Sequence, residues 1–421
     1  MAVTAAPTTG TYTPALPHDV DDVQQTACCI VGGGPAGVVL AYLLARKEIP
    51  VLVLEQHDDF DRDFRGDTVH PSTMEVMDQL GLAGRLLQLP HTKLQRIALQ
   101  TADGPFAPFS FGRLRTKYPY VALMPQARFL AFMAEEGKRF PGFRLEMGAT
   151  VQELIQERGE VKGVRYRDHA GWHEVRAPLT VGADGRFSRM RRLAGIEPVQ
   201  TAVPMDVLWF RLPRRPGDPP GAAGRIGKGH VVAMLDRGDQ WQIAYGIPKG
   251  AYRELHAAGM AALRRSVAEV APELADRVEH LQDWKQVALL SVESSRCRRW
   301  YQPRLLLIGD AAHVMSPVGG VGINYAIQDA VAAANILAEP LRAGRVTTAD
   351  LAAVQRRREL PTRVIQAVQR TIQNQLVTRA LATHGQLRIP LPLRIFLSLP
   401  LVRNIPPYLM AYGIHPERVQ M

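Results

Sequence analysis

Three groups of glycine and acidic residues in this chain have the types and spacing that bind a phosphate-rich cofactor. The first, GGGPAG at residues 32–37, has the spacing G-x-G-x-x-G. In this pattern Gly32 permits a tight turn, Gly34 lets the backbone approach a pyrophosphate, and Gly37 lets a helix pack closely on a sheet. The helix that follows would present free N–H groups and its positive dipole end to the diphosphate.

Glu55 supplies an acid at the place where such a site needs one. It follows the apolar run VLVL at residues 51–54. A carboxylate there can accept hydrogen bonds from two ribose hydroxyls, and it would repel a 2′-phosphate. The pattern therefore favours FAD or NAD over NADP at this turn.

The second and third groups each place an aspartate after an apolar run. LTVGADGRFSRMRRLAG (179–195) turns at Asp184-Gly185 before Ser188 and Arg191, which can lie on the first turns of a helix. RLLLIGDAAHVMSPVGGVGINYAIQDAVAAANIL (304–337) has a strand, then Gly309-Asp310, then a glycine loop, Pro317 to Gly322, before a long helix from about Ile323. Such a loop can stabilise negative charge with backbone N–H groups. Taken singly, each motif could also be an ordinary strand-to-helix turn with a capping acid.

The elements around the first motif must hold it in place. Residues 27–31 and 51–54 are short apolar runs typical of strands buried on both faces, and residues 38–46 between them predict a helix. This is a βαβ unit. The stretch from Ala27 to Ala45 is uncharged, but its glycines and proline favour the βαβ reading over a membrane anchor.

The three motifs, in this order, resemble those of the class A flavoprotein monooxygenases, a family typified by para-hydroxybenzoate hydroxylase and the ubiquinone-biosynthesis hydroxylases. The resemblance spans roughly residues 28–337. It implies an α/β fold in which a Rossmann-type FAD-binding domain, of the glutathione-reductase-like kind, carries an inserted antiparallel β-sheet substrate domain and C-terminal helices. The expected boundaries are a disordered leader (1–26), an FAD-binding domain (27–92, 121–198 and 290–340), a substrate domain (93–120 and 199–289) and a C-terminal helical region (341–421).

The resemblance also implies roles for single residues. The first motif would bind the ADP half of FAD, Asp184 and its neighbours both FAD and NAD(P)H, Asp310 the ribityl chain, and the glycine loop the isoalloxazine ring. Arg65 and Gln126 match positions that contact the flavin in the family, although each could instead make a surface salt bridge or a helix cap. The predicted cofactor-binding set is Gly32, Gly34, Pro35, Ala36, Gly37, Glu55, Gln56, Arg65, Gln126, Asp184, Gly185, Arg191, Gly309, Asp310, Pro317, Gly320, Gly322, Ile323 and Asn324.

The activity implied is NAD(P)H-dependent hydroxylation, or epoxidation, of an aromatic or polyketide-like molecule. NADH or NADPH would reduce FAD, and oxygen would react at flavin C4a to give a hydroperoxide that transfers one oxygen atom. No side chain is assigned as catalytic; the loop with Pro317, Gly319, Gly320 and Gly322 would lie beside the flavin ring. His313 is interpreted as part of the flavin-binding turn, not as an acid or base.

Strands predicted at 204–213, 230–238 and 240–248 would form the substrate sheet. Trp209, His230, Met234 and Tyr245 on these strands could face a pocket, but simple packing is the stronger interpretation. Beyond residue 337, Val364, Val368, Ile372 and Leu376 form an apolar stripe at helical spacing, expected to be the packed face. The proline-rich tail after it would either cap the substrate entrance or touch a membrane surface weakly.

Composition narrows the class of protein. Three cysteines, two of them adjacent, provide neither a disulfide framework nor metal-ligand spacing, so we expect a cytoplasmic protein without a metal site. A formal net charge of +11 favours anionic partners, but no nucleic-acid-binding module accompanies it. The expected partners are a small-molecule substrate and O2, in a monomer or homodimer.

Three other functions are compatible with the fold. A flavin-dependent halogenase fits less well because the W-x-W-x-I-P signature is absent. A reductase of the geranylgeranyl type would not use oxygen productively. A flavin-binding interaction protein without turnover would have no need of the glycine loop.

Overall fold

A parallel sheet carries the three motifs. In the computed structural model, which describes residues 20, 22–61, 67–101, 104–219, 221–227, 229–374, 391–400 and 402–420, this sheet has six strands. Their order is β21 (Tyr301–Gln302), β22 (Leu305–Leu307), β13 (Leu179–Gly182), β2 (Cys28–Val31), β3 (Val51–Leu54) and β9 (Phe143–Glu146). All adjacent pairs are parallel except β21 with β22.

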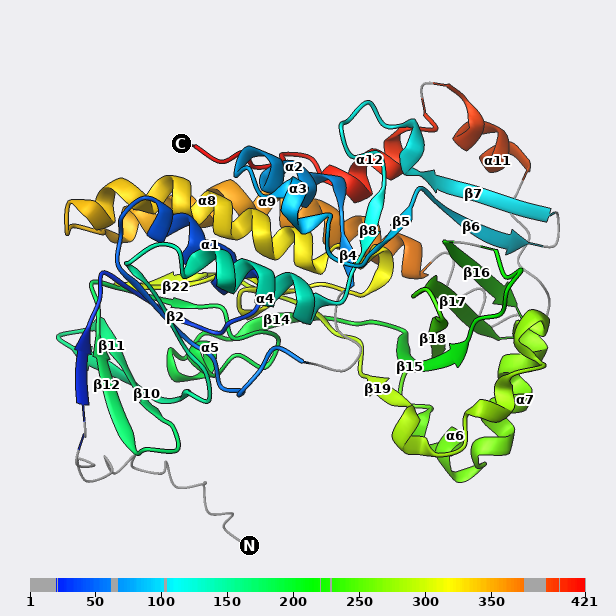
Figure 1. The fold of residues 1–421 in the computed structure, drawn as a ribbon, viewed down its shortest axis with the longest axis horizontal. Coiled ribbons are helices and arrows are strands. Elements are labelled where there is room, and N and C mark those ends of the chain that lie inside the picture. Colours follow the sequence, from blue (N-terminus) through cyan, green and yellow to red (C-terminus); the bar gives the residue numbers. More distant parts are fainter. Residues whose placement is uncertain are drawn as a thin grey trace, which may run out of the picture.

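Both faces of this sheet are covered, as its apolar strands require. Along β2, Cys28 and Ile30 pack with the helices, while Cys29 and Val31 pack with a second sheet. The helical layer is built from α1 (Pro35–Arg46), α4 (Gln126–Gly137) and α8 (Gly322–Arg342), with α9 (Thr348–Ile372) beyond α8 (Figure 1). The second sheet has the order β1 (Asp22–Gln25), β12 (Trp172–Arg176), β11 (Glu160–Arg167) and β10 (Thr150–Glu157).

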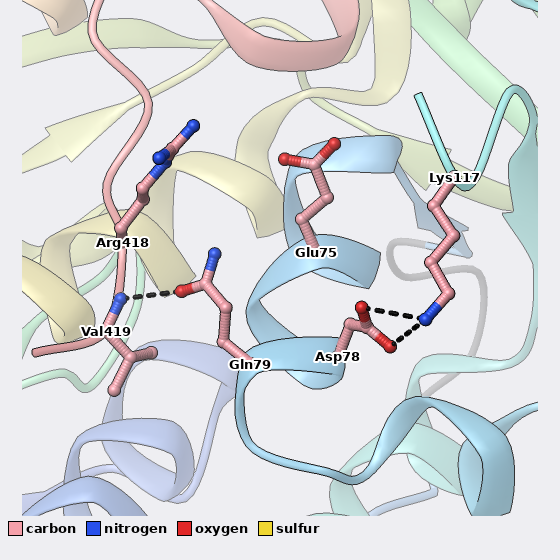
Figure 2. A pocket seen from close by; sticks show the side chains of 6 residues that line it. All are labelled: Glu75, Asp78, Gln79, Lys117, Arg418 and Val419. Atoms are coloured by element: carbon pink, nitrogen blue, oxygen red, sulfur yellow. Dashed lines mark hydrogen bonds and ion pairs between the residues drawn. The ribbon is translucent and has the colours of Figure 1, made fainter. Parts of the chain in front are cut away.

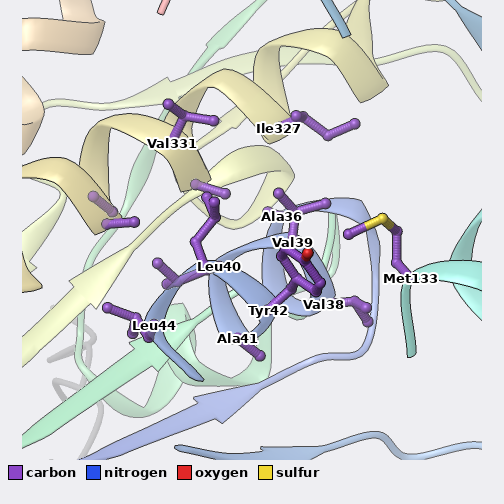
Figure 3. Close-up of a cluster of buried hydrophobic side chains, with 14 of the residues drawn as sticks. Ala36, Val38, Val39, Leu40, Ala41, Tyr42, Leu44, Met133, Ile327 and Val331 are labelled. Carbon is purple, nitrogen blue, oxygen red and sulfur yellow. The ribbon is translucent and has the colours of Figure 1, made fainter. Parts of the chain in front are cut away.

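The helix α1 fills the centre of the largest core. Val39 and Leu40 of α1 lie opposite Ile327 and Val331 of α8 (Figure 3). The βαβ unit is confirmed, although α1 begins at Pro35, earlier than the expected residue 38. Proline is favoured in the first turn of a helix because its missing N–H would have no intrahelical partner there.

A seven-stranded sheet forms the other end of the molecule. Its order is β19 (Ala288–Leu290), β15 (Met205–Pro213), β18 (Gln240–Pro248), β17 (His230–Asp236), β16 (Ala222–Gly227), β6 (Arg96–Thr101) and β7 (Gly104–Ser110). It is not wholly antiparallel as expected, because β16 pairs with β6 in parallel. α6 (Tyr252–Ala257) and α7 (Met260–Val270) lie beside it (Figure 1). Its strands come from residues 96–110 and 205–290; the proposed domain boundaries stay a prediction.

Smaller elements complete the fold. They are β4 (Thr68–Val69), β5 (Thr92–Leu94), β8 (Val121–Leu123), β14 (Pro198–Thr201), β20 (Ser294–Cys297), β23 (His313–Val314), α2 (Pro71–Gln79), α3 (Ala83–Leu86), α5 (Arg189–Leu193), α11 (Leu391–Ser398) and α12 (Ile405–Tyr412). Residues 22–25, expected to belong to a disordered leader, form β1, which pairs in parallel with β12. The rest of that leader, 1–19 and 21, lies outside the described residues, apart from residues 20 and 26.

Candidate active site

The first glycine motif is a tight turn between β2 and α1. Gly32 has a positive φ of 109°, and a Cβ there would lie 2.5 Å from the carbonyl oxygen of Ala183. A Cβ on Gly37 would lie 1.9 Å from the carbonyl oxygen of Gly32. On Gly34, by contrast, a Cβ would meet no protein atom closer than 3.9 Å. Gly32 and Gly37 are therefore required by the fold, while Gly34 leaves an open cradle next to the helix N-terminus.

Glu55 lies at the end of β3 and faces this turn. Its Oε2 accepts a hydrogen bond from the N–H of Gly33 at 2.7 Å. Its Oε1 lies 2.6 Å from Nδ1 of His57. Oε1 also accepts a hydrogen bond from the N–H of His57 at 3.2 Å, so the carboxylate is fixed in place beside the turn, and its contact with a ribose stays a prediction. His57 was not foreseen, and its only sequence signal is its position two residues after the acid; Gln56 between them is exposed.

Arg65 lies outside the described residues, which leave out residues 62–66. Asp67, which follows it, forms a mostly buried ion pair with Arg237 of the β17–β18 turn. Burial raises the pKa of Asp67 although Arg237 opposes the shift. Gln126 lies at the first position of α4, and its backbone N–H interacts with the Asp67 carboxylate. Gln126 is thus held next to Asp67, and its predicted contact with the flavin stays a prediction.

In the second motif the acid caps its own helix. The Oδ1 atom of Asp184 accepts a hydrogen bond from the Ser188 hydroxyl at 2.5 Å, and Oδ2 accepts one from the N–H of Met190 at 2.9 Å. Burial raises the pKa of Asp184. Arg191 donates to the carbonyl oxygen of Ala311 at 3.0 Å and so ties α5 to the third motif. These contacts favour a structural role for Asp184, Gly185 and Arg191; direct contact with a cofactor stays a prediction.

The third motif lies between the two long helices. Gly309 has a positive φ of 59°, and a Cβ on it would lie 3.2 Å from Cβ of Ala36 in α1 and 3.3 Å from Cβ of Ala326 in α8. Because β22, β13 and β2 are neighbours and parallel, all three motifs follow the carboxyl ends of adjacent strands. Open α/β sheets bind ligands at that edge. Asp310 lies at that edge and is half-buried, and its contact with the cofactor stays a prediction.

Asp329 of α8 anchors this turn from within the core. Its Oδ2 accepts a hydrogen bond from the N–H of Gly309 at 3.0 Å and lies 2.6 Å from Nε2 of His313. Its Oδ1 accepts a hydrogen bond from Nε of Arg358 at 2.9 Å. Burial alone would raise the pKa of Asp329, but His313 and Arg358 outweigh it and hold the pKa below its usual range. His313 is fully buried and its ring lies against Trp300, which favours the structural interpretation given to it.

The glycine loop owes its shape to residues from outside it. Gly319 and Gly320 both have positive φ angles, 83° and 62°, and a Cβ on Gly320 would lie 2.6 Å from Oγ1 of Thr68. That hydroxyl donates to the carbonyl oxygen of Gly320 at 2.7 Å. No side chain caps the first turn of α8, as is also true of α1. The N–H groups at these two helix ends therefore remain available to an anionic cofactor.

Asn324 links the loop to the segment after Arg65 and does not point to the solvent. Its Oδ1 accepts hydrogen bonds from the N–H of His70 at 3.0 Å and from the hydroxyl of Thr73 at 2.7 Å. His70 is buried, and its ring lies near the backbone of Gly319, Gly320 and Met410. Burial lowers the pKa of His70 to about 4, which keeps the ring neutral.

The most buried face of α9 is mixed, with Leu351, Val354 and Ile365 beside several polar side chains, so the predicted apolar stripe is wrong as the packed face. Val364, Val368 and Ile372 are only partly buried, and Leu376 lies outside the described residues. The side chain of Gln369 is buried and donates to the carbonyl oxygens of Ser316 and Val318, both at 2.8 Å. Other buried polar residues on this helix are Gln355, Arg358, Thr362, Gln366 and Gln373.

These glutamines were missed because an apolar stripe is the usual signal for a packed face. The recurrence of Gln at 366, 369 and 373, which is helical spacing, was the available signal. A loop with exposed carbonyl groups needs donors from its neighbour, since buried carbonyls are costly when unpaired. The face of α9 that carries these glutamines therefore holds the glycine loop in position.

The four aromatic and sulfur side chains of the substrate strands divide between two faces. Met234 and Tyr245 are buried against α7, and the Tyr245 hydroxyl lies 2.5 Å from Oγ of Ser266. His230 stacks on Tyr245, with ring centroids 4.8 Å apart. Trp209 points to the opposite face, where it packs with other apolar residues and where its indole N–H has no partner among the described residues. Packing against α7 accounts for the positions of the Met234 and Tyr245 side chains, whereas Trp209 stays a candidate for the substrate pocket.

Two of the surface hollows among the described residues contain no residue of the predicted cofactor-binding set. Figure 2 shows one of about 450 Å³ where Asp78 pairs with Lys117 and where Gln79 accepts a hydrogen bond from the N–H of Val419. The other, of about 550 Å³, lies between residues 58–61 and α4. In the parts of the chain that the structure describes, no group of His, Cys, Asp or Glu is placed to hold a metal ion. No described helix is both long enough and apolar enough to cross a bilayer.

The fold and the site define a flavoprotein with a Rossmann-type FAD site. An open cradle at Gly34, an acid at the end of β3 and two uncapped helix N-termini at one sheet edge fit an adenine dinucleotide carrying a diphosphate. Comparison with known proteins agrees. The model of an FAD-binding domain family matches residues 25–368.

Two relatives illustrate the similarity. The 6-methylpretetramide 4-monooxygenase of Streptomyces rimosus is 35% identical over 348 residues, which cover 82% of this chain and 83% of the relative. Rifampicin monooxygenase of Streptomyces venezuelae is 29% identical, over 72% of this chain and 61% of its own length. The chain belongs to this family of FAD-dependent monooxygenases, and the halogenase and reductase alternatives are not supported.

Solved structures confirm the fold. The anhydrotetracycline hydroxylase OxyS of Streptomyces rimosus has a TM-score of 0.74 at 24% identity, over 92% of this chain and 76% of that chain. PqsL of Pseudomonas aeruginosa has a TM-score of 0.73 at 23% identity, over 85% of this chain and 99% of that chain. The enzyme is thus an FAD-dependent monooxygenase, a family in which NAD(P)H is the typical reductant.

Proposed function

We propose that this enzyme hydroxylates a polycyclic aromatic compound of polyketide type in secondary metabolism, using FAD, O2 and NADPH or NADH. The observation that carries the proposal is the similarity to 6-methylpretetramide 4-monooxygenase, which extends over most of both chains. Anhydrotetracycline monooxygenase of the same species is a further relative, 30% identical over 72% of this chain. The names of both relatives refer to polyketide substrates.

The residues of the site would have separate roles in binding FAD and in shielding its ring. When bound, FAD would supply the redox chemistry that activates O2. The N-termini of α1 and α8 would hold its negatively charged groups, and Asp310 would orient its polar chain. The loop from Pro317 to Gly322 would exclude water and direct peptide dipoles at the ring. Gln369 and Thr68 support this role because they donate hydrogen bonds to backbone carbonyl groups at the two ends of the loop, Ser316 and Gly320.

The substrate would lie against the face of the seven-stranded sheet that carries Trp209. Trp209, Val231 and Ala244 on this face are only partly buried, whereas the residues on the other face are covered by α6 and α7. Partly buried apolar and aromatic side chains suit a flat ring system. The indole N–H of Trp209, without a partner among the described residues, could bind a carbonyl or hydroxyl oxygen of the substrate.

A cytoplasmic location and a monomeric or homodimeric state are part of this proposal. All three cysteines are free and buried, as expected in a reducing compartment.

The test is anaerobic reduction of the purified FAD-bound enzyme by NADPH and by NADH. The rate of flavin bleaching is measured with anhydrotetracycline, 1-naphthol or no added compound. We expect a polycyclic phenol to accelerate reduction strongly and, in air, to yield an oxygenated product. Reduction at the same rate with every compound in a panel of polycyclic phenols would contradict the proposed substrate class.

A further inference from the structure

The C-terminal region carries an exposed apolar surface that the oxygenation reaction does not use. Six of the twelve large apolar side chains that are exposed in the described part of the chain lie between residues 391 and 408. They are Leu391, Ile395, Phe396, Leu399, Ile405 and Tyr408. We call this set the α11 surface. Scattered apolar side chains are normal on a protein, but such a concentration within one short segment marks an interaction site.

The orientation of α11 makes the exposure a feature of the fold. Leu391, Ile395 and Phe396, which lie within one half of the helix circumference, are 67%, 56% and 53% exposed. Arg394, by contrast, is half-buried, and its guanidinium group lies 6.0 Å from the centre of the Phe106 ring on β7. The charged side chain therefore faces the protein and the apolar side chains face away. Figure 1 shows α11 at the edge of the molecule beside β7.

The charge of the surrounding chain identifies the kind of partner. Between Glu359 and Glu417 the sequence has no acidic residue. It has six arginines there: Arg363, Arg370, Arg379, Arg388, Arg394 and Arg403. A second copy of this chain would bring the same positive charge against it, so self-association is disfavoured. An anionic membrane surface supplies both the negative charge and the apolar layer.

We propose that the α11 surface docks the enzyme on anionic membranes, with Leu391, Ile395 and Phe396 inserted at the boundary between headgroups and acyl chains. Eight residues are far too few for a span, which needs about 20. An amphipathic helix of this kind lies in the plane of the interface. The proposal concerns where the enzyme binds and needs no turnover, so its test is independent of the proposed substrate.

The experiment is vesicle flotation of the full-length, FAD-bound protein. Vesicles of phosphatidylcholine alone are compared with vesicles that also contain phosphatidylglycerol. We expect binding to the anionic vesicles only, and we expect it to weaken as NaCl is added. The double variant Ile395→Ser, Phe396→Ser should lose affinity for the vesicles by roughly tenfold or more, because two inserted apolar side chains are lost. Arg403→Gln should weaken binding about fivefold.

A matched control uses two apolar residues exposed elsewhere. Val199→Ser with Leu289→Ser removes similar apolar area from β14 and β19 and should leave vesicle binding unchanged. Equal binding of the α11 double variant and the wild type would overturn the proposal. So would a failure of the wild type to float with anionic vesicles, or a dimer in solution that the double variant abolishes, since the surface would then serve a second copy.

Discussion

The side chains of Asp329 and Arg358 form an ion pair at 2.9 Å in which neither residue is exposed to solvent. The same carboxylate holds the N–H of Gly309 and the ring of His313, so one acid connects α9 to the turn that precedes Asp310. Glu417, near the C-terminus, lies 3.4 Å from the other side of the Arg358 guanidinium. The position of the third motif thus depends on residues far beyond it in the sequence.

Replacing Arg358 should therefore disturb both stability and the flavin. We expect Arg358→Leu to reduce the free energy of unfolding by about 3–5 kcal/mol, because a buried carboxylate loses its charged partner. The affinity for FAD should fall as the Gly309 turn loosens. Thermal unfolding and FAD titration measure the two effects. The neighbouring Arg356 is exposed, and Arg356→Leu should change stability by no more than about 0.5 kcal/mol. Similar behaviour of the two variants would show that the ion pair is unimportant.

The two glycines of the first turn should respond differently to substitution. Gly34→Val places a side chain where the protein leaves space, so the variant should fold but purify without yellow colour. Gly37→Ala places a Cβ 1.9 Å from a backbone oxygen and should destabilise the fold itself. Circular dichroism and flavin absorbance separate the outcomes. Normal FAD content in folded Gly34→Val protein would contradict the placement of the pyrophosphate.

Asp310→Ala should give folded apoprotein, because its carboxylate is predicted to bind the ribityl chain. FAD affinity is measured by the quenching of flavin fluorescence. Asp239→Ala, in an exposed turn of the substrate sheet, serves as the control. Unchanged FAD affinity in Asp310→Ala would refute the assignment.

Gln369 should affect how tightly NAD(P)H oxidation is coupled to oxygenation of the substrate more than it affects the binding of FAD. With Gln369→Leu the carbonyl groups of Ser316 and Val318 lose their donor, and the glycine loop becomes looser. We expect more H2O2 released per NAD(P)H oxidised, with FAD still bound. Gln366→Leu removes a buried amide from the same helix face, but one that holds Ser295 and Val314. Equal uncoupling in both variants would mean that general destabilisation, not the loop, is responsible.

His70 should make the enzyme acid-sensitive. Its pKa is about 4 in the folded protein, against 6.5 for an ordinary histidine, so the unfolded chain binds a proton that the folded chain does not. The neutral His70 therefore contributes about 3 kcal/mol to the free energy of unfolding. This contribution is complete above pH 6.5 and is lost as the pH falls towards 4. His70→Gln should show a smaller decrease in thermal midpoint over that window. An identical dependence of the thermal midpoint on pH in the variant would show that protonation of His70 does not lower the stability of the fold.

Local patterns were sufficient to predict the βαβ unit and the positions of the motifs. β3 was placed at its observed bounds, and the strands around Trp209 were found, because alternation and apolar runs are properties of neighbouring residues. The face on which a residue lies was harder to foresee. Val364 and Val368 looked like a packed stripe, yet they are only partly buried, because α9 turns another face, which carries Gln369, toward the carbonyl groups of the glycine loop.

The sequence by itself determined the cofactor class, since glycine spacing and a terminal acid specify a dinucleotide turn through short-range geometry. Only the tertiary structure decided what surrounds the motifs: Asp329 and Arg358 behind the Gly309 turn, and Asn324 and Thr68 beside the glycine loop. It also placed Trp209 on the face of the seven-stranded sheet away from α7. These contacts join residues far apart in the chain. Their partners are set by the packing of whole helices and sheets, which no local pattern of residue types encodes.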